Sequence, residues 1–161
     1  MDLFKEHGLR ISRKNGLLLG ALLIAYFLLM KVFGLGHNYY LRAFNAILVI
    51  FMMRQSIKIY RRYLSSEKYG AFFELFKLTM RTAFIGISVF SVFLAVYLDA
   101  LDPTFMAEIA TMESTSPFLS PVSVVGIVFI EGLGSAFVLS YLLIQAMKKK
   151  TVELGPESSK K

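Results

Sequence analysis

The feature that most constrains this chain is an apolar segment from Pro121 to Met147, which is long enough to cross a bilayer. At about 1.5 Å per residue, roughly 20 apolar residues span a hydrocarbon core of about 30 Å. The segment carries one acid, Glu131, near its middle, and three lysines follow it at 148–150. The chain therefore needs a lipid environment, and Glu131 needs a favourable setting within it.

Three more apolar stretches predict an all-α integral membrane protein, a four-helix bundle made of two antiparallel helical hairpins. The spans are placed at about 15–33, 39–53, 82–98 and 121–147, in one membrane domain at 15–150. The second span is the weakest, because Arg42 and Asn45 interrupt it. We still expect it to cross, since only then do all the basic runs reach one side of the membrane. The share of hydrophobic residues, 56%, is higher than that of ordinary soluble domains.

The basic residues predict the orientation of these spans. Of the 18 lysines and arginines, only Lys31 and Arg42 fall near one side, which we take as the outer side. The others lie in the N-terminal segment 1–14, in the connection 54–81 and after the last span. By the positive-inside rule, both termini are cytoplasmic, including a tail at 151–161 that we expect to be disordered. The predicted location is a bacterial inner membrane.

A short amphipathic helix is predicted before the third span, because the aromatic residues at 69, 72, 73 and 76 share one helical face. Basic and aromatic residues together could indicate a nucleic-acid surface. Beside apolar spans they are more typical of an interfacial belt that contacts anionic lipids, so we expect no nucleic-acid partner. A further alternative is an inner-surface module that docks an acidic partner through Arg54 to Lys77.

Glu131 defines a candidate intramembrane polar site. It lies ten residues beyond Pro121, about 15 Å below the outer end of the span and near the midplane. Asn45 and Ser91 fall at a similar depth, and Arg42 lies nearer the outer surface, so these three side chains are its candidate partners. The carboxyl is either held by hydrogen bonds in the bundle or against a partner subunit, or it serves as a proton or cation site.

Small residues spaced four apart predict where helices approach closely. Gly16 and Gly20 form such a strip on the first span, and Gly132, Ala136 and Ser140 form another on the last. These five positions are the candidate helix-packing residues, either within the bundle or between subunits.

Residues that usually carry catalytic or metal chemistry are sparse. The chain has no Cys, which excludes disulfides, thiolate nucleophiles and thiolate metal sites. His7 and His37 lie on opposite faces of the membrane in this topology and cannot share a metal ion. The acids of the loop at 99–113 lack the spacing and the turn glycine of an EF-hand. We therefore expect no enzymatic activity, no metal and no cofactor.

Several segments resemble a family of small four-helix inner-membrane proteins of unknown function that is found widely in Bacteroidota. They are NGLLLGALL, YGAFFELFK, LDALDPTFMAEI and the glycine-containing last span with its basic end. The resemblance covers most of residues 15–150. It implies a four-helix membrane domain, and it carries over no catalytic or binding residues.

Together these features predict a non-enzymatic component of the bilayer that packs against a second copy of itself, as a homo-oligomer, or against a partner in a membrane complex. The alternative is a small proton- or cation-coupled transporter that uses Glu131. The two hypotheses differ in whether the acid faces a partner helix or a water path.

Overall fold

The computed structural model of the chain describes residues 2–34, 39–62, 72–102 and 120–153. These residues form four long helices, and the described part contains no strand. The helices are α1 (Asp2–Val32), α2 (Tyr39–Arg61), α3 (Phe72–Val96) and α5 (Pro121–Glu153), and a π-helical turn, η2 (Tyr97–Leu101), continues α3. The predicted all-α fold with four helices is confirmed for this part of the chain.

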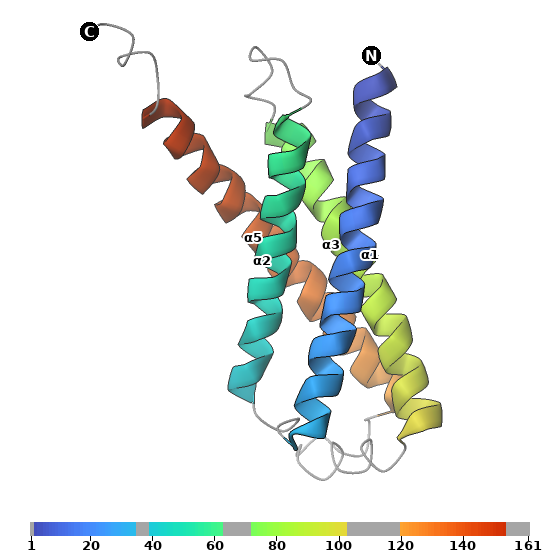
Figure 1. Ribbon diagram of the computed structural model, residues 1–161. Helices are drawn as coiled ribbons and strands as arrows, with labels where there is room; N and C mark the ends of the chain where they lie inside the picture. The colour runs from blue at the N-terminus through green and yellow to red at the C-terminus, as the bar shows by residue number, and fades with distance from the viewer. Residues whose placement is uncertain (1, 35–38, 63–71, 103–119, 154–161) are drawn as a thin grey trace, which may run out of the picture.

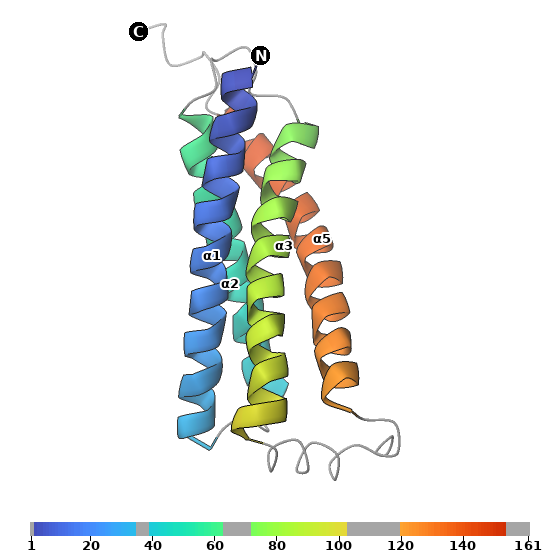
Figure 2. The ribbon, with the colours of Figure 1, turned by 90° about the vertical axis from the view of Figure 1, so that its right-hand side faces the viewer.

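Successive helices run antiparallel, so that the start of α1 and the end of α5 lie at the same end of the bundle (Figure 1). We call this the terminal end, where α1 and α3 begin and α2 and α5 finish. The opposite end, where η2 lies, is called the loop end. α3 contacts each of the other three helices and lies between α1 and α5 (Figure 2).

α1 and α3 approach each other closely because glycines lie at their contact. A Cβ atom built on Gly16 would lie 2.7 Å from Ile85 Cβ. One built on Gly20 would lie 2.8 Å from Val89 Cβ. A Cβ atom on Gly86 of α3 would likewise lie too close to a side chain of α1. Real Cβ atoms do not approach so closely, so larger residues at these positions would push the two helices apart.

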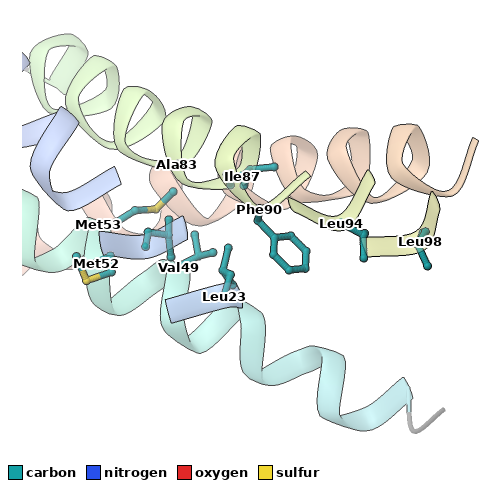
Figure 3. Packing of buried hydrophobic residues seen from close by; sticks show 11 residues of the cluster. Leu23, Val49, Met52, Met53, Ala83, Ile87, Phe90, Leu94 and Leu98 are labelled. Carbon is teal, nitrogen blue, oxygen red and sulfur yellow. The ribbon is translucent and has the colours of Figure 1, made fainter. Parts of the chain in front are cut away.

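The main hydrophobic core runs between the helices toward the loop end (Figure 3). It contains buried residues from all four helices, among them Ala136 of α5, and partly buried residues of α5 such as Val128 and Leu133 pack against it. The side chains labelled in Figure 3 are Leu23, Val49, Met52, Met53, Ala83, Ile87, Phe90, Leu94 and Leu98. A second, smaller cluster lies toward the terminal end and includes Ile57, Tyr60, Leu75, Leu78 and Ile144.

Three helices are long and apolar enough to cross a membrane, over Glu6–Val32, Phe72–Leu101 and Pro121–Met147. The last range coincides with the predicted span. α2, whose sequence includes Arg42 and Arg54, is not among them. By length and composition, the described helices therefore suggest a membrane protein with three candidate spans.

At the terminal end, the helices extend beyond the predicted membrane spans. The structure has no break at residue 14, because α1 begins at Asp2, and Ser12 and Asn15 are buried on the face that continues into the bundle. The predicted second span ends at 53, but α2 continues to Arg61. α5 likewise extends to Glu153, into the predicted tail, and residues 154–161 lie outside the described part.

The separate amphipathic helix predicted before the third span is wrong for the described residues. α3 is one continuous helix from Phe72, with Leu75, Leu78 and Thr82 on a single buried face. Neither proline nor glycine occurs between Phe72 and Gly86, so nothing interrupts the backbone hydrogen bonds between residues four apart. Phe72, Phe73 and Phe76 of the predicted aromatic face therefore belong to the first turns of α3, and residue 69 lies outside the described part.

Candidate functional site

A serine cap sets the position of Glu131 along α5. Ser120 Oγ accepts a hydrogen bond from the backbone N–H of Ser123 at 3.1 Å, and Pro121 occupies the first position of the helix. Glu131 follows ten residues later, about 15 Å along the helix axis. It therefore lies near the middle of the Pro121–Met147 span.

The Glu131 side chain is exposed on the outer surface of α5. Of the residues in the most apolar stretch of this helix, only 6% are buried within the chain, compared with 28% for α1 and 33% for α3. Among the described residues, Glu131 forms no ion pair and no hydrogen bond. The acid thus faces the surroundings of the bundle and not its interior.

Among the described side chains, Glu131 is not joined to Ser91 or Asn45. Ser91 is buried in α3, where its hydroxyl has no hydrogen-bond partner among the described residues. Asn45 is half-buried on α2, and no hydrogen bond connects it to Glu131. The backbone of Arg42 belongs to α2, but its side chain lies outside the described ones.

The predicted packing strip lies on a different side of α5 from Glu131. Ala136 and Ser140 are fully buried, and the Ser140 hydroxyl lies 3.7 Å from Met53 Sδ and 3.6 Å from Met80 Sδ. A Cβ built on Gly132 would lie 3.2 Å from Ile87 Cγ2 of α3. These three positions are therefore occupied by contacts inside the chain, as are Gly16 and Gly20 on α1.

A buried polar cluster that was not predicted joins α1, α2 and α3. Asn15 Nδ2 donates a hydrogen bond to Ser56 Oγ at 2.8 Å, and Ser56 Oγ lies 3.2 Å from Thr82 Oγ1. The two hydroxyls also donate to carbonyls one turn earlier in their own helices, at 2.9 Å each. All three side chains are buried, so the cluster provides partners for groups that are costly to desolvate alone.

The polar cluster continues toward the terminal end. Ser12 Oγ of α1 donates to Gly8 O at 2.9 Å and lies 3.4 Å from Leu78 O of α3. Tyr60 Oη of α2 donates to Glu74 Oε2 of α3 at 3.0 Å. Burial of the phenol, together with the hydrogen bond and negative charge of Glu74, raises the pKa of Tyr60 from 10.0 to about 12. These contacts hold the terminal halves of three helices together.

An ion pair joins helices at the loop end. Lys31 Nζ at the end of α1 lies 2.9 Å from Asp102 Oδ2, directly after η2. Tyr97 Oη lies 3.4 Å from the same oxygen, and the Asp102 backbone N–H bonds to Tyr97 O at 2.9 Å. The side chain of Asp102 thus connects the end of the first helix to the π-helical turn.

The chemistry of these groups is that of packing and orientation. Serine, threonine and asparagine in the buried cluster are neutral, and their hydrogen bonds are directed to one another and to carbonyls. Among the described residues, no three His, Cys, Asp or Glu side chains gather where they could hold a metal ion. Glu131 is the ionisable group at mid-span, and it is set apart from this cluster on the outer face of α5.

Comparison with known proteins gives one finding. The model of a family described as protein of unknown function (DUF4199) matches residues 14–115. The match covers most of α1 together with α2, α3 and η2, and it ends before α5 and Glu131. No curated protein and no solved structure matches the chain.

Proposed function

The chain belongs to this family of proteins of unknown function, and we propose that it is a non-enzymatic membrane protein that acts as a packing or accessory component of a membrane assembly. The observation that carries the proposal is the outer face of α5, which is unburied over most of its length and presents Glu131 near mid-span.

An acid in this position favours a protein neighbour over lipid. A charged side chain at the centre of a span costs roughly 2.5 to 3.5 kcal/mol on insertion scales, and the cost falls when the carboxyl is protonated or hydrogen-bonded. The chain itself supplies no partner for Glu131 among its described residues. A helix of another subunit that packs on α5 would supply one.

The proposed setting is a bacterial inner membrane with four spans and both termini in the cytoplasm. The resemblance to Bacteroidota inner-membrane proteins supports the location. Exposed basic residues at the terminal end support the orientation, among them Arg10, Lys14, Lys58 and Arg81. Residues 39–53 of α2 serve as the fourth span in this proposal, since α2 runs alongside the three apolar helices (Figure 1).

Native mass measurement tests the assembly. The full chain is extracted from its own membranes into lipid nanodiscs or a mild detergent, and the mass of the particle is determined. A second polypeptide in fixed ratio, or more than one copy of the chain, is the expected result. Recovery of single chains alone, at dilutions that preserve other membrane complexes, would contradict the proposal.

A small proton- or cation-coupled transporter that uses Glu131 is the second candidate, favoured by an acid at mid-span. The chain is reconstituted in vesicles, and flux is compared between the unaltered protein and Glu131→Gln. This change keeps the size and polarity of the side chain and removes its acid group. Loss of flux with intact folding supports transport, whereas equal flux rejects a role for Glu131.

A further inference from the structure

The half of α2 nearest the terminal end carries four cations on one side of the helix. They are Arg54, Lys58, Arg61 and Arg62, and we call them the α2 cationic row. At about 100° per residue, they fall within roughly a third of the helix circumference. Three of these side chains are exposed, and that of Arg61 is half-buried. The row therefore presents its charge to the surroundings of the bundle.

The described part of the chain leaves this charge unbalanced. α2 contains no Asp or Glu from Tyr39 to Arg61. The acid that meets α2 at this end, Glu74 of α3, accepts a hydrogen bond from Tyr60, which points into the bundle and not along the row. The ion pair among the described residues lies at the loop end and includes no member of the row.

Arg61 gives the row a group that favours an anion beside it. Its Nε is buried and has no hydrogen-bond partner within the described residues. A charged group that has lost water without gaining a partner is unfavourable, and a neighbouring anion offsets part of that cost. A planar guanidinium can also donate two parallel hydrogen bonds to a phosphate. The row is thus better suited to a phosphate than to a diffuse negative charge.

The same side of α2 becomes apolar toward the loop end. Phe51 and Ile47 precede Arg54 by three and seven residues, so they continue the direction of the row along the helix. Together with Phe44 they are each more than half exposed. A ligand that matches the whole face therefore needs an anionic head and an apolar tail.

This change from basic to apolar occurs at one level on three helices. Ser56 of α2 meets Asn15 of α1 and Thr82 of α3, which sets these positions side by side. Within about one turn of this level, an exposed cation is followed by an exposed apolar residue on each helix. The pairs are Arg54 and Phe51, Lys14 and Leu17, and Arg81 and Phe84. Such a boundary is typical of the depth at which lipid phosphates meet acyl chains.

We propose that the α2 cationic row binds the phosphate of an anionic phospholipid, whose acyl chains lie along Phe44, Ile47 and Phe51. The continuous face selects this occupant, because an acidic protein segment or a free phosphate would match the charge and leave the apolar part uncovered. The site goes beyond the proposed assembly role and does not depend on what covers α5. It also gives α2, which is not among the helices apolar enough to cross a membrane, an anchor at the headgroups.

Binding of a fluorescent phosphatidylglycerol to the full chain in a mild detergent tests the site. One variant removes three cations of the row through Arg54→Gln, Lys58→Gln and Arg61→Gln. The matched control removes three exposed cations of α1 and α3 at the same end, through Arg10→Gln, Lys14→Gln and Arg81→Gln. The row variant is expected to bind the lipid about tenfold more weakly or worse, and the control is expected to retain its affinity. Equal weakening in both variants would show a general attraction to positive charge and overturn the proposal.

A pair of conservative substitutions keeps the test independent of net charge and of any effect on folding. Arg61→Lys retains the charge but removes Nε and the planar pair of donors, and Arg62→Lys makes the same change at the exposed neighbour. The first substitution is expected to weaken binding severalfold and the second is not. Unchanged affinity at Arg61→Lys would contradict the phosphate contact.

Competitors identify the occupant. Inorganic phosphate and a poly-glutamate peptide carry negative charge without acyl chains, so neither is expected to displace the lipid when ionic strength is held constant. Displacement by phosphate would reduce the row to a site for a free anion, and displacement by the peptide would assign it to an acidic protein. Either result overturns the lipid site.

Discussion

Asn15 Nδ2 and Ser56 Oγ lie 2.8 Å apart in the interior of the bundle and connect α1 to α2 across 41 residues of sequence. Both side chains are buried, and Ser56 also lies within hydrogen-bond distance of Thr82 on α3. One serine hydroxyl is therefore common to three helices. Such a contact fixes the rotation of each helix, because only one face of each carries the polar group.

Substitution of Ser56 by alanine should destabilise the fold. The change leaves the Asn15 amide without its described partner on α2, and an unsatisfied buried group costs about 1 to 3 kcal/mol. Unfolding in mixed detergent micelles, followed by circular dichroism, measures the difference. Equal stability of Ser56→Ala and the unaltered chain would show that the hydrogen bond contributes nothing net.

Substitution of Ser91 by alanine is the matched case and should have the opposite outcome. The Ser91 hydroxyl is buried and has no hydrogen-bond partner among the described residues, so its removal relieves a desolvation cost. The same unfolding measurement is expected to show unchanged or increased stability. A loss as large as that of Ser56→Ala would indicate that Ser91 has a partner in the membrane-embedded protein.

The close contact of α1 with α3 predicts that Gly16→Ala is destabilising. Its Cβ would lie 2.7 Å from Ile85 Cβ and 2.9 Å from the Thr82 carbonyl oxygen, and neither atom belongs to a flexible chain end. Overpacking of this kind typically costs about 1 to 3 kcal/mol. Gly126→Ala is the control, since its Cβ meets nothing within 4 Å and should improve helix propensity. The two variants should thus shift the unfolding midpoint in opposite directions.

Much of the fold follows from apolar length and local capping, and this part could be predicted. The helix that begins at Pro121 is an example, since its apolar length matches the predicted span and Ser120 caps its first turn. Helix boundaries at the terminal end are harder to predict from the sequence. A helix that leaves the bilayer keeps its backbone hydrogen bonds while its composition becomes polar. The extension of α2 beyond Met53 and the start of α1 at Asp2 are both of this kind.

The position of Glu131 along the span could be predicted from the sequence, but the direction in which its side chain points could not. α5 has small residues on two faces, one through Ala136 and one through Gly134, and periodicity alone does not tell which face meets α3. The Asn15 and Ser56 contact also depends on the rotation of two helices relative to each other. A signal was nevertheless present, because Ser12, Asn15 and Leu19 recur on one face of α1.

The bond between Tyr60 and Glu74 predicts a loss of stability at high pH. The pKa of Tyr60 is raised from 10.0 to about 12 in the fold, so the unfolded chain loses this proton first as the pH rises. The contribution of Tyr60 is therefore fully present below pH 10 and is lost between pH 10 and 12. Unfolding across this window, compared between the unaltered chain and Tyr60→Phe, measures it. Parallel pH profiles for the two proteins would contradict the assignment.

The pair formed by Lys31 and Asp102 predicts a measurable coupling between α1 and the π-helical turn. The side chains are 29% and 20% exposed and lie 2.9 Å apart, so solvent screens the attraction only in part. Ion pairs near a surface are worth up to about 1 kcal/mol, and a coupling of this order is expected from a double-mutant cycle of Lys31→Met and Asp102→Asn. If the effects of the two single changes simply add, the ion pair does not stabilise the loop end. A positive coupling that decreases with added salt would identify the attraction as electrostatic, because neutral contacts of the same side chains do not respond to ionic strength.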